Sequence, residues 1–433
     1  MTSDRQNPDR YTVISSDGHA SALVKDYREY FDPQHRAQFD AEVEATEPMR
    51  VAYRADPARS FGKTMNLPEE MVQAFASIPT LQVGGHPGAR DPHQRMRDMD
   101  VDGIAGEVLF PDVYPETHPL FITGSGARGV RGDAGATGGK YYDVDLQYAG
   151  ARAYNRWLAD FCATASERWA GIAAVPVWDI DRAVQEIEWA AEAGLRGGIL
   201  LPSEAPELPL LNDPYYEPVW AACEEHDMPL NWHGGGQVGD AGTRPEAFAI
   251  RRTEIYLTAK RPLLFMMWGG VFERHPKLKL VFTEQDADWV PFTLDKMEYV
   301  YDTPFAGPLL RSTLPLRPRE YWARHVSVGA TFMTRGEAET RYKIGVENLM
   351  WGSDYPHPET TFPHSKSALR MSFAGLPRDE VRLMVGENAV RLYHFDQARL
   401  SSIAAEIGPT ADEIDQELTQ RPADVHVGSL GFR

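Results

Sequence analysis

Short apolar runs rich in β-branched residues alternate with longer segments of helical periodicity along most of the chain. The apolar character of each run is nearly continuous, which is typical of parallel strands that are covered on both faces. Eight runs show this pattern: Tyr11–Asp17, Gly103–Phe110, Gly171–Val177, Arg196–Leu201, Met228–His233, Leu278–Glu284, His325–Ala330 and Asn348–Asp354. Repeated strand–helix units predict an α/β fold, a (β/α)8 TIM barrel, although a doubly wound open sheet has the same alternation.

Helical segments fill most of the intervals between these runs, and some of their ends carry recognisable signals. Asp179 is a plausible N-cap, and Gly194 follows the same segment as a plausible C′ glycine. The expected helices are Asp143–Trp169, Asp179–Ala193, Pro214–Asp227, Pro245–Glu273, Asp286–Tyr301, Gly336–Val346 and Arg378–Tyr393.

Two regions interrupt the regular repeat. Residues 20–90 form a large insertion after the first strand, and residues 122–140 contain a Gly-rich loop after the second. The loop does not match a phosphate-binding P-loop, so we expect a flexible loop and hypothesise a lid on the catalytic face. We therefore predict one barrel domain over residues 11–396, followed by a tail, residues 397–433, that lies over the surface or against a partner subunit.

Composition excludes several classes of function. The chain has 44 basic and 63 acidic residues, a formal charge of −19, which disfavours nucleic-acid and anionic-membrane partners. The longest apolar stretch, Pro262–Phe272, is too short to span a bilayer, and the N-terminus lacks the apolar core of a signal peptide. Cys162 and Cys223 fall in expected helices and are interpreted as reduced packing residues. We expect a cytoplasmic protein.

The polar residues at the strand ends carry the strongest functional signal. Asp17 and His19 close the first strand, His233 closes the fifth, and Asp354 closes the eighth. The carboxyl ends of barrel strands face one shared mouth, where side chains that are distant in sequence converge. Imidazole and carboxylate ligands together suit Zn²⁺, Mn²⁺ or Fe²⁺. The pattern predicts one divalent transition metal, with zinc favoured and manganese or iron as alternatives.

Each of these residues also has an ordinary structural interpretation. A histidine is usually a packing or surface residue, and an aspartate at a strand end is often the N-cap of the next helix. The N-cap interpretation would suffice for Asp17 or for Asp354 taken alone. Four such residues on the appropriate strand ends favour the metal site.

The motifs DGH after the first strand, HGGG after the fifth and WGSDYPHPE after the eighth resemble the amidohydrolase superfamily. They are most similar to its amidohydrolase-2 branch, which includes 2-amino-3-carboxymuconate-6-semialdehyde decarboxylase. The similarity covers about residues 11–396. It implies a metal-dependent enzyme in which Asp17, His19, His233 and Asp354 occupy the metal-ligand positions.

The chain departs from the family pattern at two places. Asp17 stands where a histidine is common, so two carboxylates and two neutral imidazoles would balance a divalent charge and make the metal a weaker Lewis acid. After the sixth strand, Glu284 stands near the position of the decarboxylases' catalytic histidine. We interpret Glu284 as a candidate proton carrier, with a helix cap as the equal alternative. His357 is a candidate for binding substrate or supporting the ligands, or else a surface-loop residue.

These observations leave three functions open. The preferred one is metal-assisted hydrolysis of an amide, lactone or related bond of a small, aromatic or carboxylate-bearing molecule, in which Asp354 takes a proton from water. The close alternative is non-oxidative decarboxylation of an aromatic or unsaturated acid. The third is a barrel that binds metal or ligand without turnover. By analogy with other barrels of this kind we also expect a homodimer.

Overall fold

The computed structural model describes residues 9–432 apart from 65–68, 77, 79–80, 82–84, 113, 123–142, 202–207, 235–243, 245, 255–256, 258–259 and 427. Eight strands form one sheet in the order β1 to β8, and each strand is parallel to the next. They are β1 (Val13–His19), β2 (Ile104–Phe110), β3 (Trp169–Ala174), β4 (Gly198–Leu200), β5 (Leu230–His233), β6 (Leu280–Thr283), β7 (Val326–Thr331) and β8 (Leu349–Gly352). All eight expected strands are confirmed, with ends shifted by a few residues.

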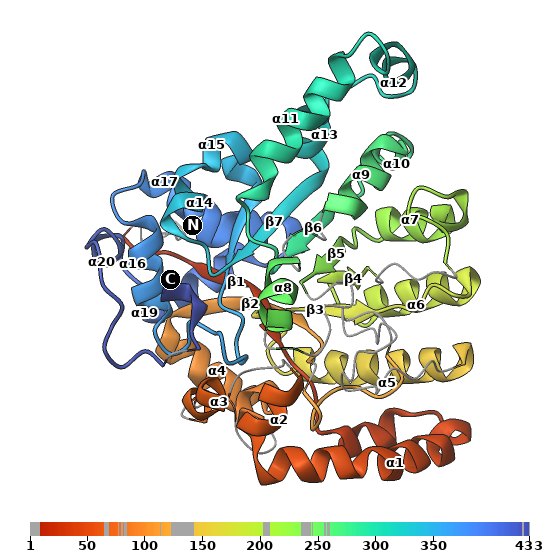
Figure 1. The fold of residues 1–433 in the computed structure, drawn as a ribbon, viewed down its shortest axis with the longest axis vertical. Coiled ribbons are helices and arrows are strands. Elements are labelled where there is room, and N and C mark those ends of the chain that lie inside the picture. Colours follow the sequence, from red (N-terminus) through yellow and green to blue (C-terminus); the bar gives the residue numbers. More distant parts are fainter. Residues whose placement is uncertain are drawn as a thin grey trace, which may run out of the picture.

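The first and last strands meet at the carboxyl end of the sheet. The Asp354 N–H donates to the Asp17 carbonyl at 3.0 Å, and the His19 N–H donates to the Tyr355 carbonyl at 2.7 Å. These bonds bring the two edges of the sheet together into a nearly closed barrel with helices between the strands (Figure 1). The expected (β/α)8 TIM barrel is therefore confirmed, and the open-sheet alternative is wrong.

The barrel interior is filled by side chains and does not form a pore. Inward-facing residues of several strands, such as Val108, Ile172 and Val281, form one buried cluster that also includes Tyr393 and Leu400. Tyr393 ends α18 (Asn388–Tyr393), and Leu400 lies on α19 (Gln397–Ile407), so the chain after β8 packs against the barrel. Close packing of the interior leaves the carboxyl strand ends as the place for chemistry.

Capping residues that are visible in the sequence mark where outer helices begin and end. They include α4 (Pro92–Asp102), α5 (Val144–Ala163), α6 (Ile180–Glu192), α7 (Glu217–Glu225), α9 (Lys260–Trp268), α11 (Trp289–Asp302), α13 (Pro318–His325), α16 (Ser365–Phe373) and α17 (Arg378–Arg382). The Asp179 side chain accepts from the Arg182 N–H at the start of α6, and Gly194 follows α6 with φ +84°. Both expected signals are confirmed.

The expected helix Pro245–Glu273 is wrong as a single element. The structure divides it into α8 (Glu246–Glu254), α9 and α10 (Val271–Arg274). The break between α9 and α10 falls at Gly270, whose φ of +69° ends one helix and turns the chain into the next. The expected helix Gly336–Val346 is divided in the same way, into α14 (Arg335–Glu339) and α15 (Arg341–Ile344).

The insertion after β1 is largely helical. It contains α1 (Arg36–Ala55), α2 (Pro57–Thr64) and α3 (Glu69–Phe75), which lie together beside the barrel (Figure 1). Nearly all of the Gly-rich loop lies outside the described residues, so its proposed lid role stays a prediction. Within the part of the chain that the structure describes, no helix is long and apolar enough to cross a membrane. Cys162 and Cys223 are both buried and free, as expected.

Candidate metal centre

Three of the expected ligands form one group at the mouth of the barrel. The Nε2 atom of His19 lies 3.5 Å from Oδ1 of Asp17, and Nε2 of His233 lies 3.3 Å from the same oxygen. Asp17 and His19 belong to β1 and His233 ends β5, so the barrel brings them together from opposite sides. Asp17 lies inside its strand instead of closing it, and it does not cap a helix.

Asp354 joins this group from the turn after β8. Its Oδ1 atom lies 3.1 Å from Nε2 of His19 and 2.9 Å from Nδ1 of His357. Its backbone has a φ of +56°, in the left-handed region that a non-glycine residue seldom adopts. The next helix, α16, has His364 as its N-cap, so a capping role for Asp354 is wrong.

Several polar atoms of this cluster are buried without a conventional partner. Among the described residues, Nε2 of His19 and both side-chain oxygens of Asp354 have no hydrogen bond and are almost inaccessible to solvent. Leaving such atoms unsatisfied is costly, and they converge on other metal-ligating groups. Two imidazoles and two carboxylates therefore fit a divalent transition ion at this place.

Neighbouring groups orient both imidazoles toward the cluster. Nδ1 of His19 donates to the Pro111 carbonyl at 3.0 Å, and Nδ1 of His233 donates to the Gly234 carbonyl at 2.9 Å. Each ring therefore presents an unprotonated Nε2 to a metal when it is neutral. The Thr331 hydroxyl at the end of β7 donates to Oδ2 of Asp17, which leaves Oδ1 directed at the two histidines.

The carboxylates of the cluster stabilise a proton on His19. Burial and nearby His357 lower the pKa of His19, but the carboxylates of Asp17 and Asp354 outweigh both and raise it to about 9. Burial alone would raise the pKa of Asp17, yet the two histidines hold it well below its ordinary value. A metal ion would replace the proton on His19 and satisfy the same carboxylates.

A glycine opposite Asp17 makes room for its side chain. A Cβ at Gly352, the last residue of β8, would lie 2.8 Å from the Asp17 Cβ. Real Cβ atoms essentially never approach so closely, so the two strands could not keep this spacing with alanine at position 352.

Glu284 lies directly beside the cluster, in the turn after β6. Its Oε2 atom is 3.6 Å from Nδ1 of His233, and it shares a group of potential ligands with Asp354 and Glu359. Burial raises the pKa of Glu284 to about 7, and the negative charge of Asp354 acts in the same direction. Helix α11 has Asp288 as its N-cap, so the capping alternative for Glu284 is wrong.

His357 is buried and stacks on a candidate ligand, so the surface-loop alternative is wrong. Its ring lies 3.8 Å from the ring of His19, centroid to centroid, with 19° between the planes. Its Nε2 atom lies 3.5 Å from Oδ1 of Asp112. Burial alone would lower the pKa of His357, but Asp354 and Asp112 raise it well above the ordinary value.

Three residues near the cluster were not predicted from the sequence. Asp112 follows β2 by two residues, and burial would raise its pKa, but His357 holds it at about 2. Glu359 lies in the turn after β8, two residues beyond His357. Arg95 of α4 is fully buried, and its Nη1 donates to the His19 carbonyl at 2.6 Å. Asp112 and Glu359 both follow strand ends, the signal that identified the other ligands.

A family model described as amidohydrolase matches residues 91–395, well over half of the chain. The chain therefore belongs to the amidohydrolase family, in the amidohydrolase-2 branch. Gamma-resorcylate decarboxylase of Rhodococcus jostii (strain RHA1) is 25% identical over 262 residues, which cover 57% of this chain and 77% of that protein.

Two further comparisons concern sequence and fold, respectively. The 2-amino-3-carboxymuconate-6-semialdehyde decarboxylase of Dictyostelium discoideum is 25% identical over 213 residues, 48% of this chain and 56% of that protein. The structure of 5-carboxyvanillate decarboxylase from Novosphingobium aromaticivorans, complexed with manganese and 4-hydroxy-3-methoxy-5-nitrobenzoic acid, is similar in fold, with a TM-score of 0.58. That comparison has 18% identity and covers 91% of this chain and 98% of the other.

The comparisons support an enzyme and correct the expected reaction. The relatives found by sequence are decarboxylases, so the preference for metal-assisted hydrolysis is wrong. The error has a chemical origin, because the same set of imidazoles and carboxylates serves both reactions. No histidine follows β6 directly, but Glu284 at that place can itself carry a proton, so this difference does not argue against decarboxylation.

Proposed function

We propose that this protein is a metal-dependent, non-oxidative decarboxylase of a small aromatic or unsaturated carboxylic acid. The observation that carries the proposal is its similarity to gamma-resorcylate decarboxylase over 77% of that protein. The buried imidazole–carboxylate cluster at the barrel mouth supports it, because this chemistry needs a positive centre that grips a carboxylate in a site shielded from water.

We propose Asp17, His19, His233 and Asp354 as the residues that hold one divalent transition metal. When bound, such an ion supplies positive charge for the substrate carboxylate and a neighbouring oxygen. Manganese is the first ion to test, because the structurally similar 5-carboxyvanillate decarboxylase contains it, and zinc, which the sequence favoured, is the second.

Glu284 is the proposed proton donor. Its raised pKa keeps a substantial fraction of the side chain protonated near neutral pH. The proton is transferred to the substrate carbon that bears the carboxylate. The bond between that carbon and the carboxylate then breaks, its electron pair returns to the ring, and CO₂ leaves.

His357 is the proposed positioning residue. It lies between Asp354 and Asp112, 2.9 Å from an oxygen of the former and 3.5 Å from an oxygen of the latter. This contact fixes the direction of the Asp354 side chain. Stacking of His357 on His19 couples the same ring to a second proposed ligand.

A panel of hydroxybenzoic and unsaturated acids, monitored for CO₂ with manganese- and zinc-loaded protein, tests the proposal. We expect CO₂ from at least one acid, and a loss of at least about 100-fold in kcat for Glu284→Gln with metal content unchanged. Asp354→Asn should lose both metal and activity, whereas the exposed control Glu225→Gln should retain both. Stoichiometric metal with no CO₂ from any acid would refute decarboxylation and favour a binding barrel.

A homodimer and a cytoplasmic location remain proposals. Light scattering coupled to gel filtration measures the first directly. A monomer at micromolar concentration would refute the dimer without affecting the proposed reaction.

A further inference from the structure

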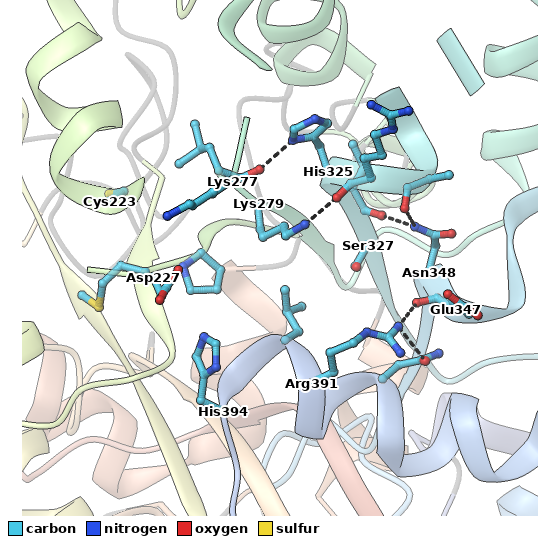
Figure 2. Close-up of a pocket in the computed structure, with 18 residues that line it drawn as sticks. Cys223, Asp227, Lys277, Lys279, His325, Ser327, Glu347, Asn348, Arg391 and His394 are labelled. Carbon is cyan, nitrogen blue, oxygen red and sulfur yellow. Dashed lines mark hydrogen bonds between the residues drawn. The ribbon is translucent and has the colours of Figure 1, made fainter. Parts of the chain in front are cut away.

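A cavity lies at the opposite end of the barrel from the candidate metal centre. We call it the basal cavity, and it has a volume of about 220 Å³ (Figure 2). Its walls come from the residues that precede β5, β6 and β8, from the start of β7, and from α18 and the residue after it. The size is below the 300–1,000 Å³ that is usual for drug-sized ligands, so only a small molecule fits.

Positive charge is concentrated around this cavity. Four of its lining residues are lysines or arginines, Lys277, Lys279, Arg324 and Arg391, and two are acids, Asp227 and Glu347. The balance is two positive charges in a chain whose net charge is −19. A local excess of cations on so acidic a protein indicates a place that attracts anions.

Two of the cations are held in place by neutral groups. Nζ of Lys279 donates to the Arg324 carbonyl at 2.5 Å, and Nη2 of Arg391 donates to the Glu347 carbonyl at 2.9 Å (Figure 2). Nη2 of Arg391 also donates to the Asn388 side-chain oxygen at 3.2 Å. These contacts orient the charges without neutralising them.

None of the four cations forms an ion pair within 4.0 Å in the described part of the chain. Elsewhere the protein pairs its arginines readily, since Arg317 and Arg378 each contact two carboxylates. Burial and the charge of Arg391 both lower the pKa of Lys279, which shows that the two cations repel each other. An anion bound in the cavity would offset this repulsion.

We propose that the basal cavity binds a small oxyanion with two negative charges, of the phosphate or dicarboxylate type. The guanidinium of Arg391 offers a planar set of donors that matches an oxyanion, and the ammonium of Lys279 adds a point charge. The Ser327 hydroxyl lines the same cavity and offers a further donor. Because the cavity lies at the amino ends of the strands, the anion is not a substrate of the metal centre.

Titration calorimetry and thermal unfolding of the metal-loaded protein test this inference with phosphate and with malonate. Sodium chloride at matched ionic strength separates specific binding from charge screening. We expect one saturable site per chain and a melting temperature that rises with ligand concentration. Tighter binding of phosphate than of malonate would indicate a phosphate-type ligand, and the reverse order would indicate a dicarboxylate.

Lys279→Met and Arg391→Gln should each weaken binding at least about tenfold, since each removes a charge-assisted contact. Lys343→Met, an exposed cation outside the cavity, should leave affinity unchanged. The exposed Lys277→Met is a further variant if either substitution prevents folding. Equal effects of chloride and both oxyanions would overturn the inference, as would unchanged affinity in both Lys279→Met and Arg391→Gln.

Discussion

Replacement of Asp102 by asparagine should make the protein more resistant to high pH. Asp102 ends α4 and is only 3% exposed. Its Oδ1 atom accepts from the Ser365 N–H at 2.9 Å, and its Oδ2 accepts from the Ser365 hydroxyl. Burial raises the pKa of Asp102 to about 7, although both hydrogen bonds act in the opposite direction.

The sign of the effect follows from the raised pKa. The folded protein binds this proton more tightly than the unfolded chain, whose aspartate has the ordinary value of 3.8. The stabilising contribution of the protonated carboxyl is therefore complete below pH 3.8 and is lost as the pH rises to about 7. The interval between these two values corresponds to about 4 kcal/mol of unfolding free energy.

Asparagine keeps the shape of the side chain but cannot ionise. Between pH 5 and pH 8, the free energy of unfolding of the wild type should fall by about 2.5 kcal/mol relative to Asp102→Asn. Urea unfolding followed by tryptophan fluorescence at both pH values measures this difference, with the exposed Asp26→Asn as control. If the stability difference between wild type and Asp102→Asn is the same at pH 5 and pH 8, the reasoning is refuted.

Three further predictions concern the framework of the metal centre. Gly352→Ala should displace Asp17, with about 1–3 kcal/mol lost in thermal or urea unfolding and at least tenfold weaker metal binding, whereas Gly336→Ala, where the added Cβ would meet only the Thr334 hydroxyl oxygen at an ordinary 3.9 Å, should change neither. Arg95→Met leaves the Glu107 carboxylate, now 2.6 Å from Nε of Arg95, buried and unpaired. It should cost about 3–5 kcal/mol, and an added Glu107→Gln should recover part of that loss; an additive double-mutant cycle would contradict this. Removal of the metal by a chelator should lower the melting temperature reversibly, because carboxylates buried in the cluster lose their countercharge; an unchanged melting temperature would argue against a metal there.

The barrel could be predicted from sequence because parallel strands are buried on both faces. That burial produces continuous apolar runs whatever the intervening loops contain, and the residues at their carboxyl ends necessarily face one mouth. The proximity of Asp17, His19, His233 and Asp354 followed from this argument alone. Their exact placement did not, since Asp17 lies inside β1 and Asp354 two residues beyond β8.

The supporting residues were harder to predict because their roles depend on partners remote in sequence. Arg95 lies in a charged helix and resembles a solvated residue until Glu107 of β2 is placed against it. Asp112 resembles a turn residue until the chain after β8 brings His357 beside it. The reaction was also beyond the sequence argument, because the ligand set itself is common to hydrolysis and decarboxylation.

The seam between β1 and β8 also determines when the metal centre can exist. Asp17 and His19 are synthesised well before Asp354, which follows His19 by 335 residues. The backbone bonds from Asp354 to Asp17 and from His19 to Tyr355 form only after both strands are available. Metal loading at the complete site is therefore a late event that follows closure of the barrel. A nascent chain arrested before β8 would carry Asp17, His19 and His233 but lack Asp354, and cellular metal supply would act on the finished protein.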